Sequence, residues 1–235
     1  TKKKKKENKK TKKKTMPISS APLLAFYGGS FNPVHYGHLK TAQYLAQLLP
    51  ESKIIFLPNS SPPHKDTAKL SYEARRAMLQ AAIAECLPEC DAHGQSRYSI
   101  SDLEADASQR HYTVDTLQKL KQLYHNNELA FIMGWDSLAT LDQWKQGLEL
   151  HHLAKLIVFK RPHTEQELPQ AVQQSLAQYP EHYLIVPNPE FDLSSSAIRQ
   201  AIALTKANEP LPELAAALPR SVHAIIATHG YYRSA

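Results

Sequence analysis

The sequence predicts an α/β fold, with a doubly wound, mainly parallel sheet and a small helical part at the C-terminal end. Three observations support this prediction. Six short apolar runs of strand length recur along the chain. Segments with apolar residues at every third or fourth position separate many of them, as in amphipathic helices. Polar or glycine-rich loops follow several runs, and such loops bind ligands at the carboxyl ends of parallel strands.

The predicted strands and helices alternate in chain order. The strands are Leu23–Tyr27, Lys53–Pro58, Ser96–Ile100, Glu128–Gly134, Lys155–Lys160 and His182–Pro187. The helices start near Gly37, at Ser71 with that residue as N-cap, near Thr113 as another cap, at Thr164, after Phe191 and at Ser221. In the first helix, one face carries Leu39, Ala42, Leu45, Ala46 and Leu49. In the second, Arg75 and Arg76 are expected in solvent, although one of them could reach a phosphate.

Charge is distributed unevenly along the 235 residues, whose net charge is +6. Residues 1–16 hold ten Lys and one Glu, which gives +9 and leaves −3 for residues 17–235. A run of this kind cannot bury a core, so we expect a disordered tail. It is either an arm for nucleic acid or anionic membrane or, as we favour, a leader before a natural start at Met16. Residues 17–235 are expected to form one domain, with 190–235 as its helical part.

The body of the chain gives no sign of a membrane or nucleic-acid partner. No apolar run approaches the roughly 20 residues that span a bilayer, and no secretory signal pattern occurs. The slightly acidic balance argues against a nucleic-acid-binding surface. Cys86 and Cys90 form a single C-x3-C pair, so a zinc site is less expected than inert thiols. A reducing, cytoplasmic location fits.

The first strand is followed by the stretch GGSFNPVHYGH, residues 28–38. Gly28 and Gly29 lack a Cβ, so a phosphate or a nucleobase can approach their backbone closely. Ser30 adds a hydroxyl group and a backbone N–H. The loop therefore offers several groups that could contact a nucleotide.

The same stretch ends in H-Y-G-H, with His35 and His38 on either side of Gly37. This spacing places one imidazole before a helix and the other in its first turn. The helix N-terminus adds free N–H groups and partial positive charge. Each feature alone has an ordinary explanation, since a glycine pair is usually a turn and a lone His is usually a polar or packing residue. Together they predict a polyphosphate site.

The stretch is neither a P-loop nor a dinucleotide fingerprint. It resembles the signature of the nucleotidyltransferase superfamily of α/β-phosphodiesterases, whose hallmark is (H/T)-x-G-H. Those enzymes transfer a nucleotidyl group from a nucleoside triphosphate to a phosphate. The resemblance implies catalytic roles for His35 and His38, and ATP contacts for Gly28, Gly29, Ser30, Phe31 and Gly37. Asn32 stands where the family commonly has Asp.

The second strand runs into N-S-S-P-P-H-K, residues 59–65. By itself this is an ordinary proline-rich surface loop. Its sequence resembles the second motif of the bacterial nicotinate-nucleotide adenylyltransferases, and the resemblance implies that Asn59, His64 and Lys65 bind the mononucleotide.

Two later segments extend this resemblance. H-Y-T-V-D-T-L is similar to the family's S-Y-T-x-x-T-L, which gives backbone groups to the pyridine carboxylate; Thr113 lies in it, and His111 replaces the usual Ser. G-W-D-S-L is followed by Trp144, as in the motif whose Trp stacks on the nicotinate ring. Trp144 could equally be a core residue. Asp136 is expected to position ribose or the reacting phosphates.

The last motif lies at a helix start. Ser194, Ser196 and Arg199 offer hydroxyls, free N–H groups and a guanidinium to an anion, although a plain helix cap would also explain the serines. The segment resembles I-S-x-T-x-I-R, which binds the triphosphate, with Ser196 where Thr is usual.

The resemblance covers most of residues 23–233 and implies a Rossmann-like fold. It implies adenylyl transfer from ATP, as its Mg²⁺ complex, to nicotinate mononucleotide, giving nicotinate adenine dinucleotide and pyrophosphate in NAD biosynthesis. It implies no resident metal. Two alternatives stay open: an adenylyltransferase for nicotinamide mononucleotide or another phosphate acceptor, and a non-catalytic nucleotide-binding protein.

Overall fold

The structure is a computed structural model that describes residues 22–60, 70–90, 94–160, 167–187, 193–204 and 212–233. The lysine-rich residues 1–16, and the pair His64 and Lys65, lie outside these ranges. None of the helices inside them has the length and apolar character that crossing a bilayer requires.

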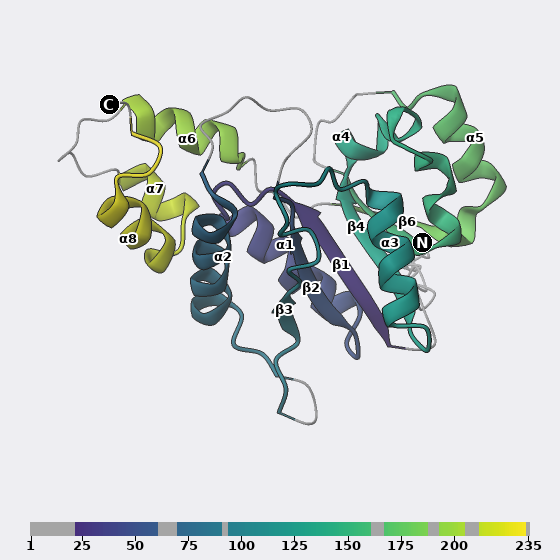
Figure 1. Cartoon of the computed structure of the whole chain (residues 1–235), viewed down its shortest axis with the longest axis horizontal. Coiled ribbons are helices and arrows are strands. Elements are labelled where there is room, and N and C mark those ends of the chain that lie inside the picture. Colours follow the sequence, from purple (N-terminus) through teal and green to yellow (C-terminus); the bar gives the residue numbers. More distant parts are fainter. Residues whose placement is uncertain are drawn as a thin grey trace, which may run out of the picture.

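Six strands form one sheet in the order β3-β2-β1-β4-β5-β6, and every pairing is parallel (Figure 1). The strands are β1 (Leu23–Gly29), β2 (Lys53–Pro58), β3 (Tyr98–Ile100), β4 (Glu128–Gly134), β5 (Lys155–Lys160) and β6 (Tyr183–Pro187). The order reverses between β1 and β4, the two central strands. This is the doubly wound sheet that the sequence predicts, and its switch point lies at the carboxyl ends of β1 and β4.

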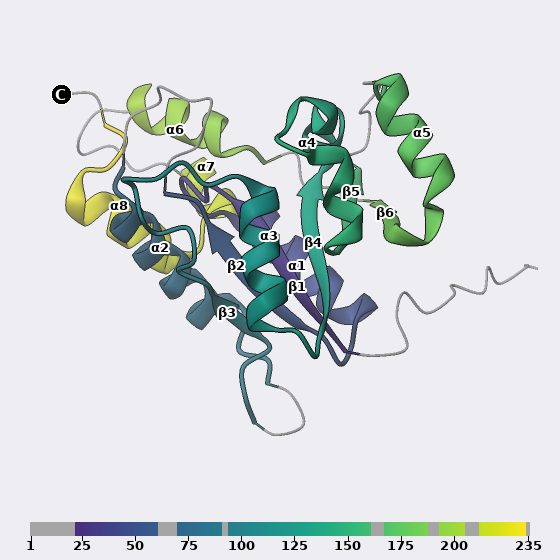
Figure 2. The ribbon, with the colours of Figure 1, turned by 45° about the vertical axis from the view of Figure 1, so that its right-hand side comes forward.

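Helices cover both faces of the sheet, and Figures 1 and 2 show α1 and α3 on opposite sides of it. One face packs against α1 (Tyr36–Leu48) and α2 (Tyr72–Cys86). The other packs against α3 (Thr113–Leu123), the 3-10 helix η2 (Gly147–His152) and α5 (Gln170–Gln178). Short helical turns complete this second side: α4 (Trp135–Leu138), η1 (Leu141–Gln143) and η3 (Pro180–His182).

Three C-terminal helices gather beside α2 at one end of the sheet (Figure 1). They are α6 (Ser195–Leu204), α7 (Pro212–Ala217) and α8 (Arg220–His229). The Glu85 carboxylate of α2 accepts the N–H groups of Arg220 and Ser221 at 3.1 and 2.8 Å, which caps the start of α8. Gly230, at φ 63°, ends α8 in the left-handed conformation.

One predicted helix start and one predicted cap are wrong. Helix α5 begins at Gln170 rather than Thr164, and Pro169 is its N-cap; residues 161–166 lie outside the described ranges. A proline disfavours helical backbone in the residue before it, which explains the late start. Thr113 is not a cap: Tyr112 holds that position, and Thr113 is the first residue of α3.

The two thiols lie at the end of α2 and just after it. Cys86 is half-buried at the end of α2, where burial raises the pKa of its thiol, and Cys90 is exposed.

Candidate active site

The two histidines of H-Y-G-H lie together at the N-terminus of α1, directly beyond the carboxyl end of β1. Their rings stack, with centroids 3.8 Å apart and planes inclined by 30°. The backbone N–H of His35 donates to Nδ1 of His38 at 3.3 Å. Because Nδ1 accepts, the hydrogen of the neutral His38 ring is on Nε2, a nitrogen that can donate to a phosphate oxygen.

A buried aromatic ring supports this pair. Phe31 is 1% exposed, and its ring meets that of His38 edge-on at 5.1 Å and that of Tyr27 at 5.6 Å. Its backbone adopts φ 45°, in the left-handed region that non-glycine residues rarely occupy. A Cβ on Gly29 would lie 3.1 Å from the Phe31 ring, so this glycine permits the close packing.

Helix α6 reaches the same loop from the other end of the chain. The Ser195 hydroxyl donates to the carbonyl of Pro33 at 3.0 Å. Arg199 donates from Nη1 to the carbonyl of Asn32 at 2.6 Å and from Nη2 to the Ser196 hydroxyl at 3.2 Å. The structure therefore brings Ser196 and Arg199 to the loop of His35 and His38, as the sequence motif requires.

Ser194 lies at the start of α6 and accepts the N–H of Ala197 at 3.1 Å. This is the ordinary capping bond that the serines alone would predict. It fixes the helix start while leaving the Ser196 hydroxyl as an acceptor from Arg199.

Tyr232, after the last helix, contacts the loop as well. Its hydroxyl donates to Oδ1 of Asn32 at 2.6 Å, and Asn32 is only 9% exposed. Burial raises the pKa of the Tyr232 phenol, so the group remains a neutral donor near neutral pH. Sequence reasoning missed this contact, which joins residues 200 positions apart. The residue before it, Tyr231, has no such bond to Asn32 among the described contacts.

Arg75 is the clearest correction to the sequence predictions. It was expected in solvent, but it is 2% exposed. Its guanidinium donates to the carbonyls of Ser30 at 2.6 Å, Asn59 at 2.7 Å and Ser60 at 3.3 Å. Its neighbour Arg76 does lie near solvent, where it pairs with Asp102 at 2.7 Å.

The loop after β2 begins at the same edge of the sheet. The N–H of Asn59 donates to the Gly29 carbonyl at 3.1 Å, which joins this loop to the end of β1. The Asn59 side chain places a buried Oδ1 here that has no hydrogen-bond partner among the described residues. An unsatisfied buried acceptor is unusual in folded proteins.

A buried carboxyl group, Glu104, lies between this loop and α3. Its Oε1 accepts the Thr116 hydroxyl at 2.7 Å, and its carbonyl accepts the N–H of Ser60 at 3.0 Å. Burial raises the pKa of the Glu104 carboxyl group. These bonds hold the first turn of α3, which contains the half-buried Thr113, against the end of β2.

The β4 end supplies Asp136 and Trp144. Asp136 is exposed in the first turn of α4. Trp144 is half-buried: its ring packs against the core on the α3 side, and its Nε1 donates to the Thr140 hydroxyl at 3.3 Å. Both expectations for this residue, packing and stacking, are compatible with that position. Trp135 is more deeply buried, with the Lys160 ammonium 4.4 Å from its ring centroid.

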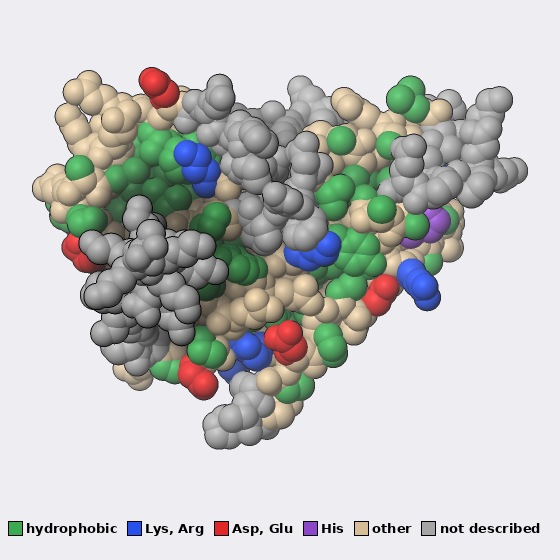
Figure 3. Space-filling view, turned by 180° about the vertical axis from the view of Figure 1, so that it is seen from behind, with side chains coloured by type: hydrophobic (Ala, Val, Ile, Leu, Met, Phe, Trp, Pro, Cys, Tyr) green, Lys and Arg blue, Asp and Glu red, His purple; other side chains and the backbone are tan. Residues whose placement is uncertain are grey.

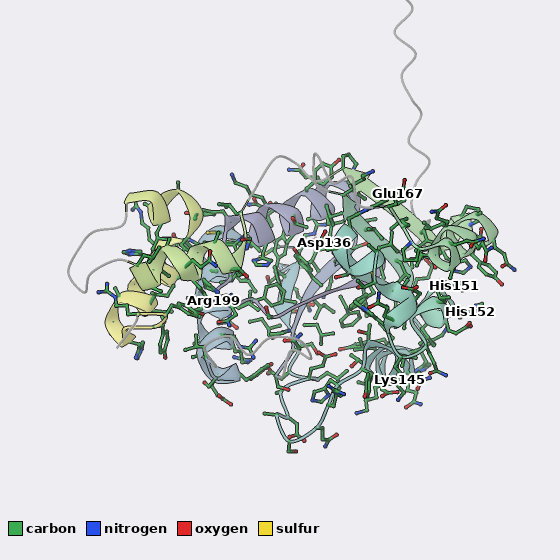
Figure 4. All side chains as sticks on the ribbon, turned by 90° about the horizontal axis from the view of Figure 1, so that it is seen from above. Asp136, Lys145, His151, His152, Glu167 and Arg199 are labelled. Atoms are coloured by element: carbon green, nitrogen blue, oxygen red, sulfur yellow. The ribbon has the colours of Figure 1, made fainter. Side chains whose placement is uncertain are left out.

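Seen from above, Arg199 lies on the side of the C-terminal helices and Asp136 near α4, while His151 and His152 lie together farther out (Figure 4).

From behind, the charged side chains of the described residues are scattered singly and form no continuous basic area (Figure 3). Within the described ranges, no three His, Cys, Asp or Glu side chains are grouped so that they could hold a metal. The site offers guanidinium groups, imidazole nitrogens and a helix N-terminus, which suit phosphate groups.

Comparison with known families agrees with this chemistry. Residues 26–201 match the sequence profile of the cytidylyltransferase-like family. The chain belongs to this family.

Individual relatives of this chain have a more specific name than the family does. It is 33% identical over 228 residues to a protein of Syntrophotalea carbinolica named "Probable nicotinate-nucleotide adenylyltransferase", with 90% of this chain and 97% of the relative covered. It is 43% identical over 146 residues to a protein of that name from Sodalis glossinidius. That alignment covers 62% of this chain and 64% of the relative, just under two thirds of the relative's length.

The fold comparison gives the same architecture. The Plasmodium falciparum nicotinic acid mononucleotide adenylyltransferase complexed with NaAD superimposes with a TM-score of 0.71, at 19% identity, over 90% of this chain and 98% of that one. The doubly wound nucleotidyltransferase fold expected from the sequence is therefore confirmed, as is the resemblance to the nicotinate-nucleotide adenylyltransferases.

Proposed function

We propose that this chain transfers the adenylyl group of ATP to nicotinate mononucleotide, forming nicotinate adenine dinucleotide and pyrophosphate in NAD biosynthesis. One observation carries the proposal: the stacked His35 and His38 at the N-terminus of α1, with Ser196 and Arg199 of α6 on the same loop. The names of its relatives support nicotinate mononucleotide as the acceptor. A cytoplasmic location is part of the proposal.

The reaction needs no protein nucleophile, because the phosphate of the mononucleotide is one. An oxygen of that phosphate attacks the α-phosphorus of ATP, a new P–O bond forms, and the bond from the α-phosphorus to the bridging oxygen of the β-phosphate breaks. Pyrophosphate leaves with the bonding electron pair. Catalysis then depends on positioning and on stabilising charge in the transition state.

The triphosphate side is assigned to the loop and to α6. His38 donates from Nε2 to the developing charge, and His35 orients it through the ring stack and the bond to Nδ1. The guanidinium of Arg199 and the hydroxyls of Ser30 and Ser196 bind the phosphates. The backbone of Gly28, Gly29, Phe31 and Gly37 lines the ATP site. Mg²⁺ enters bound to ATP and is held mainly by phosphates and water.

The mononucleotide side is assigned to the ends of β2, α3 and β4. Asn59 presents its unsatisfied Oδ1, and the first turn of α3 at Thr113 presents N–H groups to the pyridine carboxylate. Trp144 stacks on the pyridine ring, and Asp136 binds a ribose hydroxyl. His64 and Lys65 complete this assignment from outside the described residues.

The test is pyrophosphate release from MgATP with nicotinate mononucleotide, compared with nicotinamide mononucleotide and with 4′-phosphopantetheine. His38→Ala is the active-site variant. His125→Ala is the matched control, because His125 is an exposed residue just before β4, at the opposite edge of the sheet. We expect the acid to be preferred and His38→Ala to lower kcat by about 10²–10³-fold, the usual effect of removing one transition-state donor.

Preference for another acceptor would retain the chemistry and change the substrate. Binding of ATP without turnover of any acceptor would favour a nucleotide-binding protein. Equal losses in His38→Ala and His125→Ala would refute the assigned site.

A further inference from the structure

We infer that Arg75 is a positioning residue of the proposed adenylyl transfer. It holds the loop after β1, which is assigned to ATP, and the loop after β2, which is assigned to the mononucleotide, at a fixed position relative to each other. It lies in the first turns of α2, away from the motif residues in sequence, and its side chain is buried. This inference rests on the function proposed above, and it assigns Arg75 no contact with either substrate.

The guanidinium connects the ends of two neighbouring strands. Nη1 donates to the Ser30 carbonyl, one residue past β1, at 2.6 Å. Nη2 donates to the Asn59 carbonyl, one residue past β2, at 2.7 Å and to that of Ser60 at 3.3 Å. Nε donates to the Leu70 carbonyl at 3.4 Å. A planar fork can hold both loops at once, which a single ammonium group cannot do with the same geometry.

The bond to Ser30 also fixes where a donor points. The peptide unit is planar and trans, so its C=O and N–H groups point in opposite directions. Because the Ser30 carbonyl points toward Arg75, the N–H of Phe31 points away from Arg75, to the other side of the loop. Backbone N–H groups fixed before the reaction starts are the donors that stabilise charge on phosphates most effectively.

Fold stability alone is a poor explanation for this arginine. Every hydrogen bond that Arg75 makes with the described residues ends on a main-chain carbonyl. Burial lowers the pKa of its guanidinium, partly offset by Tyr232, Tyr72 and Glu73. A role in the reaction explains this arginine better than a role in stability does, because a buried cation beside a phosphate-binding loop adds positive potential to that loop.

The test compares two adjacent arginines on one helix. Arg75→Lys and Arg75→Gln are the test variants, and Arg76→Lys and Arg76→Gln are the matched controls, because Arg76 lies near solvent and pairs with Asp102. For each protein, kcat and KM for both substrates, the affinity for a non-hydrolysable ATP analogue, and the urea unfolding midpoint are measured.

We expect Arg75→Lys to remain folded with a kcat lowered at least 10-fold, Arg75→Gln to lose more, and KM to change less than kcat. Both Arg76 variants should remain within 2-fold of wild type. A purely structural role would lower the unfolding midpoint while leaving kcat of the folded fraction unchanged, and that result, or full activity of Arg75→Gln, would overturn the inference. If wild type itself turns over no acceptor, the proposed function fails first and the inference falls with it.

Discussion

Gly37 is the position where the geometry makes its sharpest prediction. A Cβ at this position would lie 2.9 Å from both Cε1 and Nδ1 of the His35 ring, and 3.6 Å from Cβ of Leu193. Carbon atoms pack best at about 3.5–4.0 Å, so Gly37→Ala must displace the imidazole by roughly 0.6 Å or more. The ring cannot move freely, because His35 is 4% exposed and stacks on His38.

Activity should therefore change much more than stability. A displacement of about 1 Å in a catalytic arrangement can cost about 10²-fold, so we expect Gly37→Ala to lower kcat by about 10–100-fold. Gly37 lies in the first turn of α1 without a positive φ. Alanine is favoured over glycine within helices by up to about 1 kcal/mol, which offsets the steric contact. The free energy of unfolding should therefore remain within about 1 kcal/mol of wild type.

Pyrophosphate release and urea unfolding followed by circular dichroism measure the two quantities on the same preparation. Gln47→Ala is the control, because Gln47 is an exposed residue of the same helix. Wild-type kcat in Gly37→Ala would show that the position of His35 does not limit the reaction. A large loss of stability would show that the glycine is needed for the backbone rather than for the imidazole.

Three further predictions concern stability. Tyr232→Phe leaves Oδ1 of the buried Asn32 without its donor and should cost about 1–3 kcal/mol in urea unfolding, whereas Tyr231→Phe should cost less. Burial raises the pKa of the Glu104 carboxyl group, so the folded state binds its proton more tightly than the unfolded state does. The stability of the wild type therefore falls as pH rises above about 4.3 and this proton is lost. Glu104→Gln has no such proton to lose, so it should become more stable relative to wild type over the same pH range. Asp102→Asn should behave oppositely: the hydrogen bond from Arg76 lowers the pKa of the Asp102 carboxyl group, so its contribution is present above about pH 3.9 and is lost as pH falls through the lowered pKa. Unfolding curves measured between pH 3 and 8 would give the free energy of unfolding of each variant relative to wild type as a function of pH. If this difference varied with pH in the same direction for both variants, the assignments would be contradicted.

The sequence predicts well whatever depends on neighbours in the chain. The apolar runs become β4 (Glu128–Gly134) and β5 (Lys155–Lys160) at the predicted bounds, because a buried parallel strand must be apolar on both faces. The spacing of Leu39, Ala42 and Leu45 gives the buried face of α1. Loop motifs come together because all parallel strands end at the same edge of the sheet.

Contacts between distant side chains could not be predicted in this way. Nothing near Tyr232 in the sequence indicates Asn32 as its partner, because that bond depends on how α8 docks on α2. For Arg75 a signal was present. It precedes Met78 and Leu79 by three and four residues, so it lies on the buried face of α2, whereas Arg76 precedes only Leu79 at such a spacing and lies beside that face. Assigning both arginines to solvent hid that signal.

The loop after β1 shows why these distant contacts matter to the proposed chemistry. Three of its carbonyls are held by side chains from two different helices: Ser30 by Arg75 of α2, and Asn32 and Pro33 by Arg199 and Ser195 of α6. At Ser30 and Pro33, a carbonyl held on one side of the loop turns the N–H of the following trans peptide to the other side, where the loop would bind its anion. The peptide after the Asn32 carbonyl leads into proline, which has no N–H to offer. Donors fixed by folding need no reorganisation when charge develops on the phosphates, which is the condition for strong electrostatic stabilisation. The C-terminal helices are therefore part of the proposed phosphate site, although most of its donors belong to residues 28–38.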